Sequence, residues 1–246
     1  MIFDGHTDTL ARLDQASSFF EGTNGTARPT QLDLPRAFSS RVSGIVLAAC
    51  AEAEPDHAAA WDRMKGIWDG IAAGIPDVDD APELFLMAEG CEPLLGLPDL
   101  EDVIGELGVA SLTWNGENSL GGGIGSSVGL TARGRQLAAR LHEAGVVLDV
   151  SHLCDRSRRD LLLTGLPTVA THCNCREVWD HPRNLPTDDI REIASGGGVI
   201  GITFPPAFLG KQAGLEHVAM HLEYALEIAG PDGVGFGSDF DGSPSL

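Results

Sequence analysis

Short apolar runs recur along the chain, each bounded by turn residues and followed by polar positions. Eight of these runs have the length of strands. Most are continuous rather than alternating, as expected of parallel strands that are covered on both faces. The predicted strands span residues 2–8, 43–49, 83–89, 109–114, 146–152, 168–172, 198–204 and 233–239.

Helical patterns lie between the apolar runs. The stretch 56–74 is rich in helix-forming residues and ends at a glycine, and 131–145 begins at a threonine cap and ends at Gly145. The stretches 187–197 and 214–230 have the same character. Strand and helix therefore alternate along the sequence, which is the pattern of parallel α/β folds.

Eight such strands predict an α/β fold of the (β/α)8 TIM-barrel type, which typically takes about 250 residues. The 246 residues are therefore expected to form one domain, 1–246. The segment 9–42 is expected to be irregular and to overlie the strand ends. Only seven residues, "FDGSPSL", follow Asp239, so the final helix of the barrel is expected to be missing from this chain.

Composition narrows the choice of partners. The chain carries 36 acidic and 16 basic residues, a formal charge of −20, and a field of this sign repels phosphate backbones and anionic lipid. We therefore expect neither nucleic acid nor a membrane as partner. The start, "MIFDGHTDTL", lacks the features of a signal peptide, and the five cysteines lack paired CxxC spacing. Free thiols in the cytoplasm are the expectation.

Ligand-type side chains stand where the predicted strands end, which is where (β/α)8 barrels build their active sites. Imidazoles and carboxylates together suit zinc or another divalent ion, and this many donors suit two ions that share a carboxylate. One histidine alone at a strand end is more often a hydrogen-bonded rim residue, but several together predict a metal site. The strand-end residues are His6, Asp8, Glu89, Trp114, Asn115, His152, His172 and Asp239.

The remaining candidates receive plainer interpretations. Asp241 is expected to be a turn residue. Five other histidines fall in predicted helices or loops and are expected to be solvated or to pack; they are His57, His142, His181, His217 and His221.

Seven motifs, in order, resemble the membrane (renal) dipeptidase family of zinc peptidases. They are "DGHTDTL", "MAEG", "LTWNGEN", "LDVSH", "THCNCR", "RNLPTDD" and "GFGSDFDG", and together they run from residue 4 to residue 242. The resemblance implies a binuclear zinc barrel that hydrolyses dipeptides, including those with a D-residue at the C-terminal position. It also implies a homodimer.

The resemblance also implies roles for individual residues. His6 and Asp8 would bind one zinc, Glu89 would bridge, and His152 and His172 would bind the other. Matching by position makes Arg183 the partner of the substrate carboxylate and Asp239 the catalytic acid and base. The implied reaction is attack on the peptide carbonyl by a hydroxide that bridges the two metals.

One position departs from the family. The fourth-strand motif usually reads "LTHN", with a histidine that contacts the substrate carbonyl oxygen, whereas this chain has Trp114 followed by Asn115. An indole has one N–H donor and cannot carry a proton as imidazole does. We expect both residues to face the substrate, with Trp114 as an apolar wall. The alternative is that Trp114 only packs against the 9–42 segment.

Two rival functions stay open on the sequence. The same barrel and metals could serve an amidohydrolase that acts on N-acyl amino acids, lactones or a deaminated base, because one fold hosts many reactions. A non-catalytic small-molecule binding protein on the same fold is the second. Arg183 and the family resemblance together favour the dipeptidase over the first, and the full ligand set with Asp239 favours an enzyme over the second.

Overall fold

Eight parallel strands of the described chain form the centre of the fold. The computed structural model describes residues 2–23 and 29–244. The strands pair in the order β6-β5-β4-β3-β2-β1-β8-β7, and a parallel bridge between Ala170 and Ile200 joins β6 to β7. The sheet is therefore nearly closed, and the predicted (β/α)8 barrel is confirmed. The strands are β1 (Ile2–Thr7), β2 (Val42–Ala49), β3 (Glu83–Glu89), β4 (Leu107–Ser111), β5 (Val147–Asp149), β6 (Thr168–Val169), β7 (Ile200–Ile202) and β8 (Val234–Phe236).

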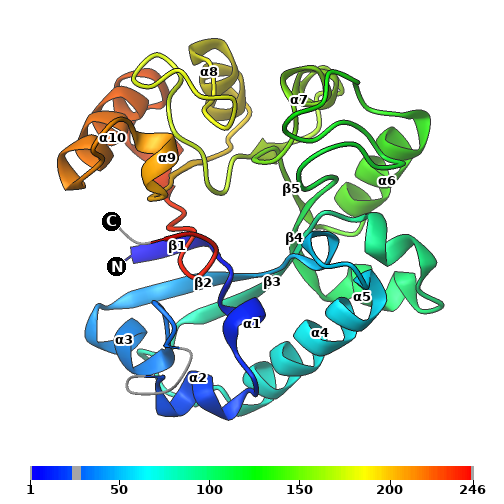
Figure 1. The fold of residues 1–246 in the computed structure, drawn as a ribbon, viewed down its shortest axis with the longest axis vertical. Helices are drawn as coiled ribbons and strands as arrows, with labels where there is room; N and C mark the ends of the chain where they lie inside the picture. The colour runs from blue at the N-terminus through cyan, green and yellow to red at the C-terminus, as the bar shows by residue number, and fades with distance from the viewer. Residues whose placement is uncertain (1, 24–28, 245–246) are drawn as a thin grey trace.

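Helices surround the strands (Figure 1). They are α1 (Thr9–Arg12), α2 (Ser17–Glu21), α3 (Leu34–Ser39), α4 (His57–Gly74), α5 (Leu100–Glu106), α6 (Ala132–Glu143), α7 (Asp155–Leu162), α8 (Thr187–Ser195), α9 (Pro206–Leu209) and α10 (Leu215–Ala229). Short 3₁₀ helices occupy Ala51–Ala53, Glu92–Gly96 and Pro231–Gly233. The described chain forms no helix between β8 and Pro244. None of its helices combines the length and the apolar character needed to cross a bilayer.

The four predicted helices begin and end close to where the sequence signals place them. Asp56 caps α4 by accepting the amide of Ala59 at 3.1 Å, and Thr131 caps α6 by accepting the amide of Gly134 at 3.0 Å. Gly145, just beyond α6, has a φ of 85°, which a residue without a Cβ adopts at little cost. Side-chain caps therefore set the starts of α4 and α6, whereas α8 begins after Pro186 without one.

The expectation that residues 9–42 are irregular is wrong for the described part of that segment. It contains α1, α2 and α3, which have 4, 5 and 6 residues. Helices this short span less than two turns, so they produce no repeating apolar face in the sequence. The segment contacts the turn that follows β8, because Gln31 and Asp241 exchange two hydrogen bonds of 2.7 Å.

The apolar core has two parts. A small cluster of Val46, Ala48, Met87 and Val109, with Phe85 packed against it, joins β2, β3 and β4. The larger cluster contains the other apolar residues of these strands and the apolar residues on the buried side of the helices. In α4 that side consists of Ala60, Trp61, Met64, Ile67, Trp68 and Ile71. These strands are apolar on both faces, which explains why their sequences do not alternate.

The later strands are shorter than the apolar runs that predicted them, because side chains replace the strand ladder at the mouth of the barrel. Asp149, at the end of β5, accepts the amides of Ser151 at 3.2 Å and Thr171 at 2.8 Å. Asp4 in β1 accepts the amide of Ser238 at 2.8 Å, just beyond β8. The backbone groups remain satisfied while the chain leaves the sheet.

Three glycines make room for the backbone that leads to His172. A Cβ at Gly237 or Gly201 would lie under 3.0 Å from the carbonyl oxygen of Thr171, and one at Gly5 would lie 3.1 Å from it. Real Cβ atoms essentially never come closer than 3.0 Å to backbone atoms. The peptide between Thr171 and His172 therefore excludes a side chain at Gly201 and Gly237 and leaves little room for one at Gly5.

We predict that Gly237→Ala destabilises the protein because the obstructing atom belongs to the backbone and cannot rotate away. Overpacking of this kind costs about 1–3 kcal/mol, and for a chain of this length each kcal/mol lowers Tm by about 2–4 °C. The matched control is Gly235→Ala, whose new Cβ would meet only Val199 Cγ1 at 3.6 Å. Thermal unfolding of both variants is the measurement. Equal Tm values would contradict the packing argument.

Candidate metal centre

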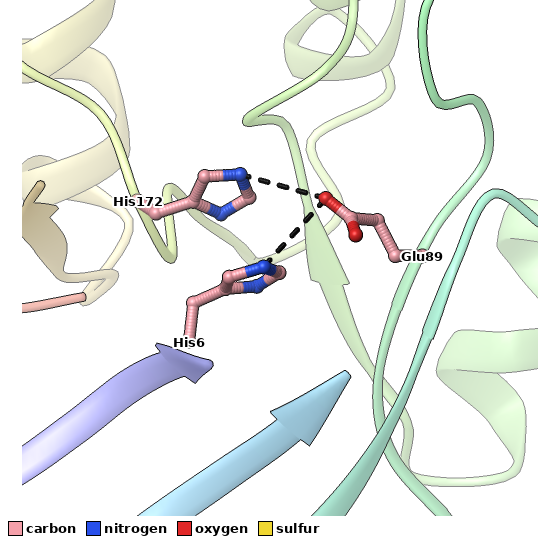
Figure 2. A group of neighbouring side chains, drawn as sticks. All are labelled: His6, Glu89 and His172. Atoms are coloured by element: carbon pink, nitrogen blue, oxygen red, sulfur yellow. Dashed lines mark ion pairs between the residues drawn. The ribbon is translucent and has the colours of Figure 1, made fainter. Parts of the chain in front are cut away.

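The ligand-type residues meet at the carboxyl-terminal mouth of the barrel. His6 lies near the end of β1 and Glu89 is the last residue of β3. His152, His172 and Asp239 follow the ends of β5, β6 and β8 on the connecting loops. Figure 2 shows the imidazoles of His6 and His172 facing the same carboxylate oxygen of Glu89. The strand order therefore brings together residues that are far apart in sequence.

Glu89 is at the centre of three histidines. Its Oε1 lies 2.8 Å from Nε2 of His152, 3.6 Å from Nε2 of His172 and 3.7 Å from Nε2 of His6. The Nε2 atoms of His152 and His172 are 3.0 Å apart. One carboxylate oxygen thus faces nitrogens from three different strand ends.

A second group of donors lies beside His6. The donor atoms of His6, Asp8 and Asp239 all lie within 4.8 Å of one another, as do those of His6, Glu89 and His172. Backbone hydrogen bonds between the ends of β1 and β8 hold this group: Asp239 donates to the carbonyl of His6 at 3.0 Å, and Asp8 donates to that of Phe240 at 2.8 Å. The two groups share His6.

The backbone at the end of β8 has an uncommon conformation. Asp239 and Asp241 have φ angles of 59° and 71°, in the left-handed region that aspartate tolerates better than most residues. The Asp241 carboxylate accepts hydrogen bonds from the Thr9 hydroxyl and from the backbone amide of Gln31, each at 2.7 Å. Asp241 therefore ties the segment before β2 to the turn that presents Asp239.

Hydrogen bonds to the outer nitrogens orient two of the imidazoles. The Thr171 hydroxyl lies 2.8 Å from Nδ1 of His172, and Oδ1 of Asn115 lies 3.2 Å from Nδ1 of His152. Such partners fix the ring orientation of a metal-binding histidine and leave Nε2 directed at the centre. The structure thus places Asn115, expected to face the substrate, against a ligand-type histidine.

The electrostatics of the centre favour positive charge. Burial by itself would lower the pKa of His6, yet the carboxylates of Glu89, Asp8 and Asp239 raise it to about 10. Burial raises the pKa of Asp239 well above its usual value, and the charge of Asp8 adds to this shift. Buried carboxylates this close repel one another unless a cation lies between them.

The donor set fits a divalent metal. Both ring nitrogens of His6 are buried and have no hydrogen-bond partner, which is costly for a polar group unless another ligand satisfies it. Burial, followed by nearby positive charge, lowers the pKa of His152 and of His172. Both are therefore neutral at pH 7, the form that binds metal. Neutral imidazoles with carboxylates are the ligands that zinc prefers.

A cavity of about 460 Å³ opens over the donors. Arg183 lines it and is 5% exposed, with its guanidinium 5.3 Å from the centre of the Phe208 ring. Its Nη2 lies 3.3 Å from Nε2 of His152 and 3.4 Å from the carbonyl oxygen of His172, and its Nη1 donates to the carbonyl of Ser151. Arg183 therefore places a positive charge between the cavity and the loops that carry His152 and His172.

The loop after β4 forms another part of the wall. Trp114 lines the cavity, its ring centre 6.2 Å from that of His152. Its backbone amide donates to the Glu52 carboxylate at 2.9 Å, and Nδ2 of Asn118 donates to the same carboxylate at 2.8 Å. Glu52 thereby holds the loop that carries Trp114.

Sequence reasoning missed several lining residues. His181 was expected to be solvated or to pack, but it lines the cavity, and its Nδ1 accepts the backbone amide of Arg183 at 3.2 Å. Cys50 and Ile124 also line it. Only the "HPRNLP" motif that contains Arg183 could have pointed to His181. By contrast, His221 is fully buried and accepts the amide of Cys175, a packing role.

A buried set of histidine and carboxylate donors at the carboxyl-terminal mouth of a (β/α)8 barrel is the arrangement of metal-dependent enzymes. The family model described as "Membrane dipeptidase (Peptidase family M19)" matches residues 79–246. The chain belongs to this family, and the expected family resemblance is confirmed.

Individual relatives agree with this placement. An uncharacterised dipeptidase of Schizosaccharomyces pombe is 24% identical over 98% of this chain and 69% of its own length. An uncharacterised protein of Klebsiella pneumoniae, from the pqqA 5′ region, is 35% identical over 52% of this chain. The match spans about half, 53%, of the Klebsiella protein.

A solved structure has the same fold over nearly the whole chain. A metallopeptidase from Rhodobacter sphaeroides, liganded with a phosphinate mimic of the dipeptide L-Ala-D-Ala, superposes with a TM-score of 0.82. The superposition covers 99% of this chain and 87% of the other at 25% sequence identity.

We predict that divalent cations stabilise the protein through His6. A cation at a hundred times its Kd adds about 2.7 kcal/mol of stability, roughly 5–10 °C in Tm for a chain of this length. Zinc should raise Tm by about this amount, a chelator should reverse the change, and His6→Ala should remove most of it. The matched control is His142→Ala, at an exposed position of α6. An unchanged zinc response in His6→Ala would exclude His6 as a ligand.

Proposed function

We propose that the protein is a metal-dependent dipeptidase that uses two divalent ions, with zinc as the first candidate. The observation that carries the proposal is the convergence of three histidine Nε2 atoms on one oxygen of Glu89, with Asp8 and Asp239 beside them. His6 and Asp8 would hold one ion, His152 and His172 the other, and Glu89 would bridge both. Such ions polarise a carbonyl group and make water a nucleophile near neutral pH.

Asp239 is proposed as the group that moves the proton. It lines the cavity, lies beside Asp8, and has a pKa raised by burial and then by the charge of Asp8. A carboxyl group with a raised pKa can accept a proton from the attacking water and return it to the leaving amine. Its positive φ directs the side chain from a turn rather than from a strand.

Arg183 is proposed as the partner of the substrate's terminal carboxylate. It lines the cavity and lies 3.3 Å from Nε2 of His152, so a bound carboxylate would lie close to the reacting peptide bond. A longer peptide would have its carboxylate too far away. This separation restricts the substrate to one residue on the carboxyl side of the scissile bond, and membership of the dipeptidase family then favours a dipeptide over an N-acyl amino acid.

The cavity walls would set side-chain preference. Trp114 would cover the substrate beside His152, in place of a polar group that could stabilise an oxyanion. We further propose that L-D dipeptides are accepted. The support is the Rhodobacter sphaeroides metallopeptidase, whose bound ligand mimics L-Ala-D-Ala and whose fold covers 99% of this chain.

We predict that Asp239→Asn lowers turnover of a dipeptide by about 10²–10⁴-fold, the usual contribution of a general acid and base. Asparagine keeps the size of the side chain but cannot carry the proton. Metal analysis of the same variant should still give about two equivalents of zinc, as expected of a two-metal site. If the variant loses zinc, Asp239 is a ligand instead.

The control for this variant is Asp241→Asn. Asp241 lies two positions away and binds Thr9 and Gln31. Its replacement should affect stability and leave turnover within a few-fold of the parent.

We predict that Arg183→Met reduces dipeptide kcat/KM by about ten- to a hundredfold, because it removes a charge-assisted pair worth about 1.5–3 kcal/mol. The same dipeptide with an amidated C-terminus lacks the partner charge, so its already low kcat/KM should barely change. Steady-state kinetics on both substrates is the measurement. Equal losses on the two would show that Arg183 acts only through its bonds to the carbonyls of Ser151 and His172.

A further inference from the structure

The loop that carries Arg183 has little regular structure of its own. It runs from β6 to α8, and between Ala170 and Pro186 it forms only isolated bridges, one of them between Cys175 and Leu185. A guanidinium that recognises a carboxylate must be held within a fraction of an ångström. Something other than a strand ladder has to supply that precision here.

Arg176, on the same loop, binds the backbone on both sides of Arg183. Its Nε donates to the carbonyl oxygen of Asn184 at 2.9 Å, and its Nη2 donates to that of Pro182 at 3.3 Å. These are the residues directly before and after Arg183. One planar guanidinium therefore holds the ends of the short segment from which the Arg183 side chain projects.

The other edge of the Arg176 guanidinium is fixed to a helix. Its Nη1 and Nη2 donate to the two carboxylate oxygens of Asp155, each at 2.8 Å, in the bidentate geometry that gives arginine pairs their specificity. Asp155 is the first residue of α7. Arg176 therefore connects the Arg183 segment to the start of a helix.

Asp155 is itself held in place. It accepts Nη2 of Arg158 at 2.7 Å, and the buried Arg158 also pairs with Asp189 of α8 at 2.6 Å. The arginine pairs, that of Arg176 first, hold the pKa of Asp155 at about 2. The anchor is thus charged at any physiological pH and is linked to two helices.

We propose that Arg176 is a positioning residue for the recognition of the substrate carboxylate: clamped to Asp155, it sets the backbone that aims Arg183 into the cavity. Arg176 is not among the residues that line the cavity, so it would act only through Arg183. The proposal rests on the carboxylate-binding role proposed above for Arg183. Asp155 and Arg176 would together form the anchor.

The test compares Arg176→Met with the parent, both loaded with zinc. We expect KM for a dipeptide with a free carboxylate to rise about tenfold and kcat to stay within about threefold, the pattern of lost substrate binding. The amidated dipeptide should be unaffected. Because Arg176 acts through Arg183, the double variant Arg176→Met/Arg183→Met should lose no more kcat/KM than Arg183→Met alone.

Hydrogen–deuterium exchange supplies a readout that does not depend on activity. In metal-free protein, the amides of Arg183, Asn184 and Leu185 should exchange at least about tenfold faster in Arg176→Met, because the clamp no longer holds them. The matched control is Arg159→Met, which removes an exposed α7–α8 ion pair with Glu192. It should change neither the kinetics nor the exchange of this segment.

The outcomes separate the two proposals. Unchanged exchange in Arg176→Met, equal kinetic losses on free and amidated dipeptides, or additive losses in the double variant would each overturn the positioning role. Failure of the zinc-loaded parent to hydrolyse any dipeptide would count against the proposed function instead. The exchange measurement would then still decide whether Arg176 holds the segment.

Discussion

The site depends on the burial of several carboxylates in one small space. Glu89 is 2% exposed and touches three imidazoles, while Asp8 and Asp239 crowd the other side of His6. Without positive charge this arrangement would be repulsive, and the pKa of His6, raised to about 10, shows how strongly the centre attracts a proton. Divalent ions would satisfy the same demand with more charge, and one of them would bind a ring nitrogen of His6 that lacks a hydrogen-bond partner.

Residues at the ends of the barrel strands position those donors. Where β5 and β8 end, Asp149 and Asp4 accept backbone amides that a longer strand would have paired. The peptide before His172 then passes over glycines of β1, β7 and the end of β8. Stability of the sheet and placement of the donors are therefore coupled, because the same residues end the strands and direct the loops into the mouth.

The two cavity-lining residues proposed to contact the substrate lie on separate loops around this centre. The segment with Arg183 is tied to α7 through Arg176 and Asp155, and the loop with Trp114 is tied to the turn after β2 through Glu52. Each tie joins a cavity-lining residue to a neighbouring element rather than to its own strand. The same loops also contact the histidines, because His172 precedes Arg183 on one loop and Asn115, next to Trp114, lies 3.2 Å from Nδ1 of His152.

The sequence by itself determined the strand count and four of the helices, and it predicted the candidate donor residues. Continuous apolar runs, capping residues and polar strand ends are local signals, and the barrel topology brings His6, Glu89, His152 and His172 together once the strands are in order. The tertiary structure alone decided where β5 to β8 end and that the described part of 9–42 contains short helices. It also decided that His181 lines the cavity, that Glu52 binds the loop of Trp114, and that Arg176 binds the backbone on both sides of Arg183. Those features depend on contacts between loops distant in sequence, and hydrogen bonds of that kind leave no periodic trace in the chain.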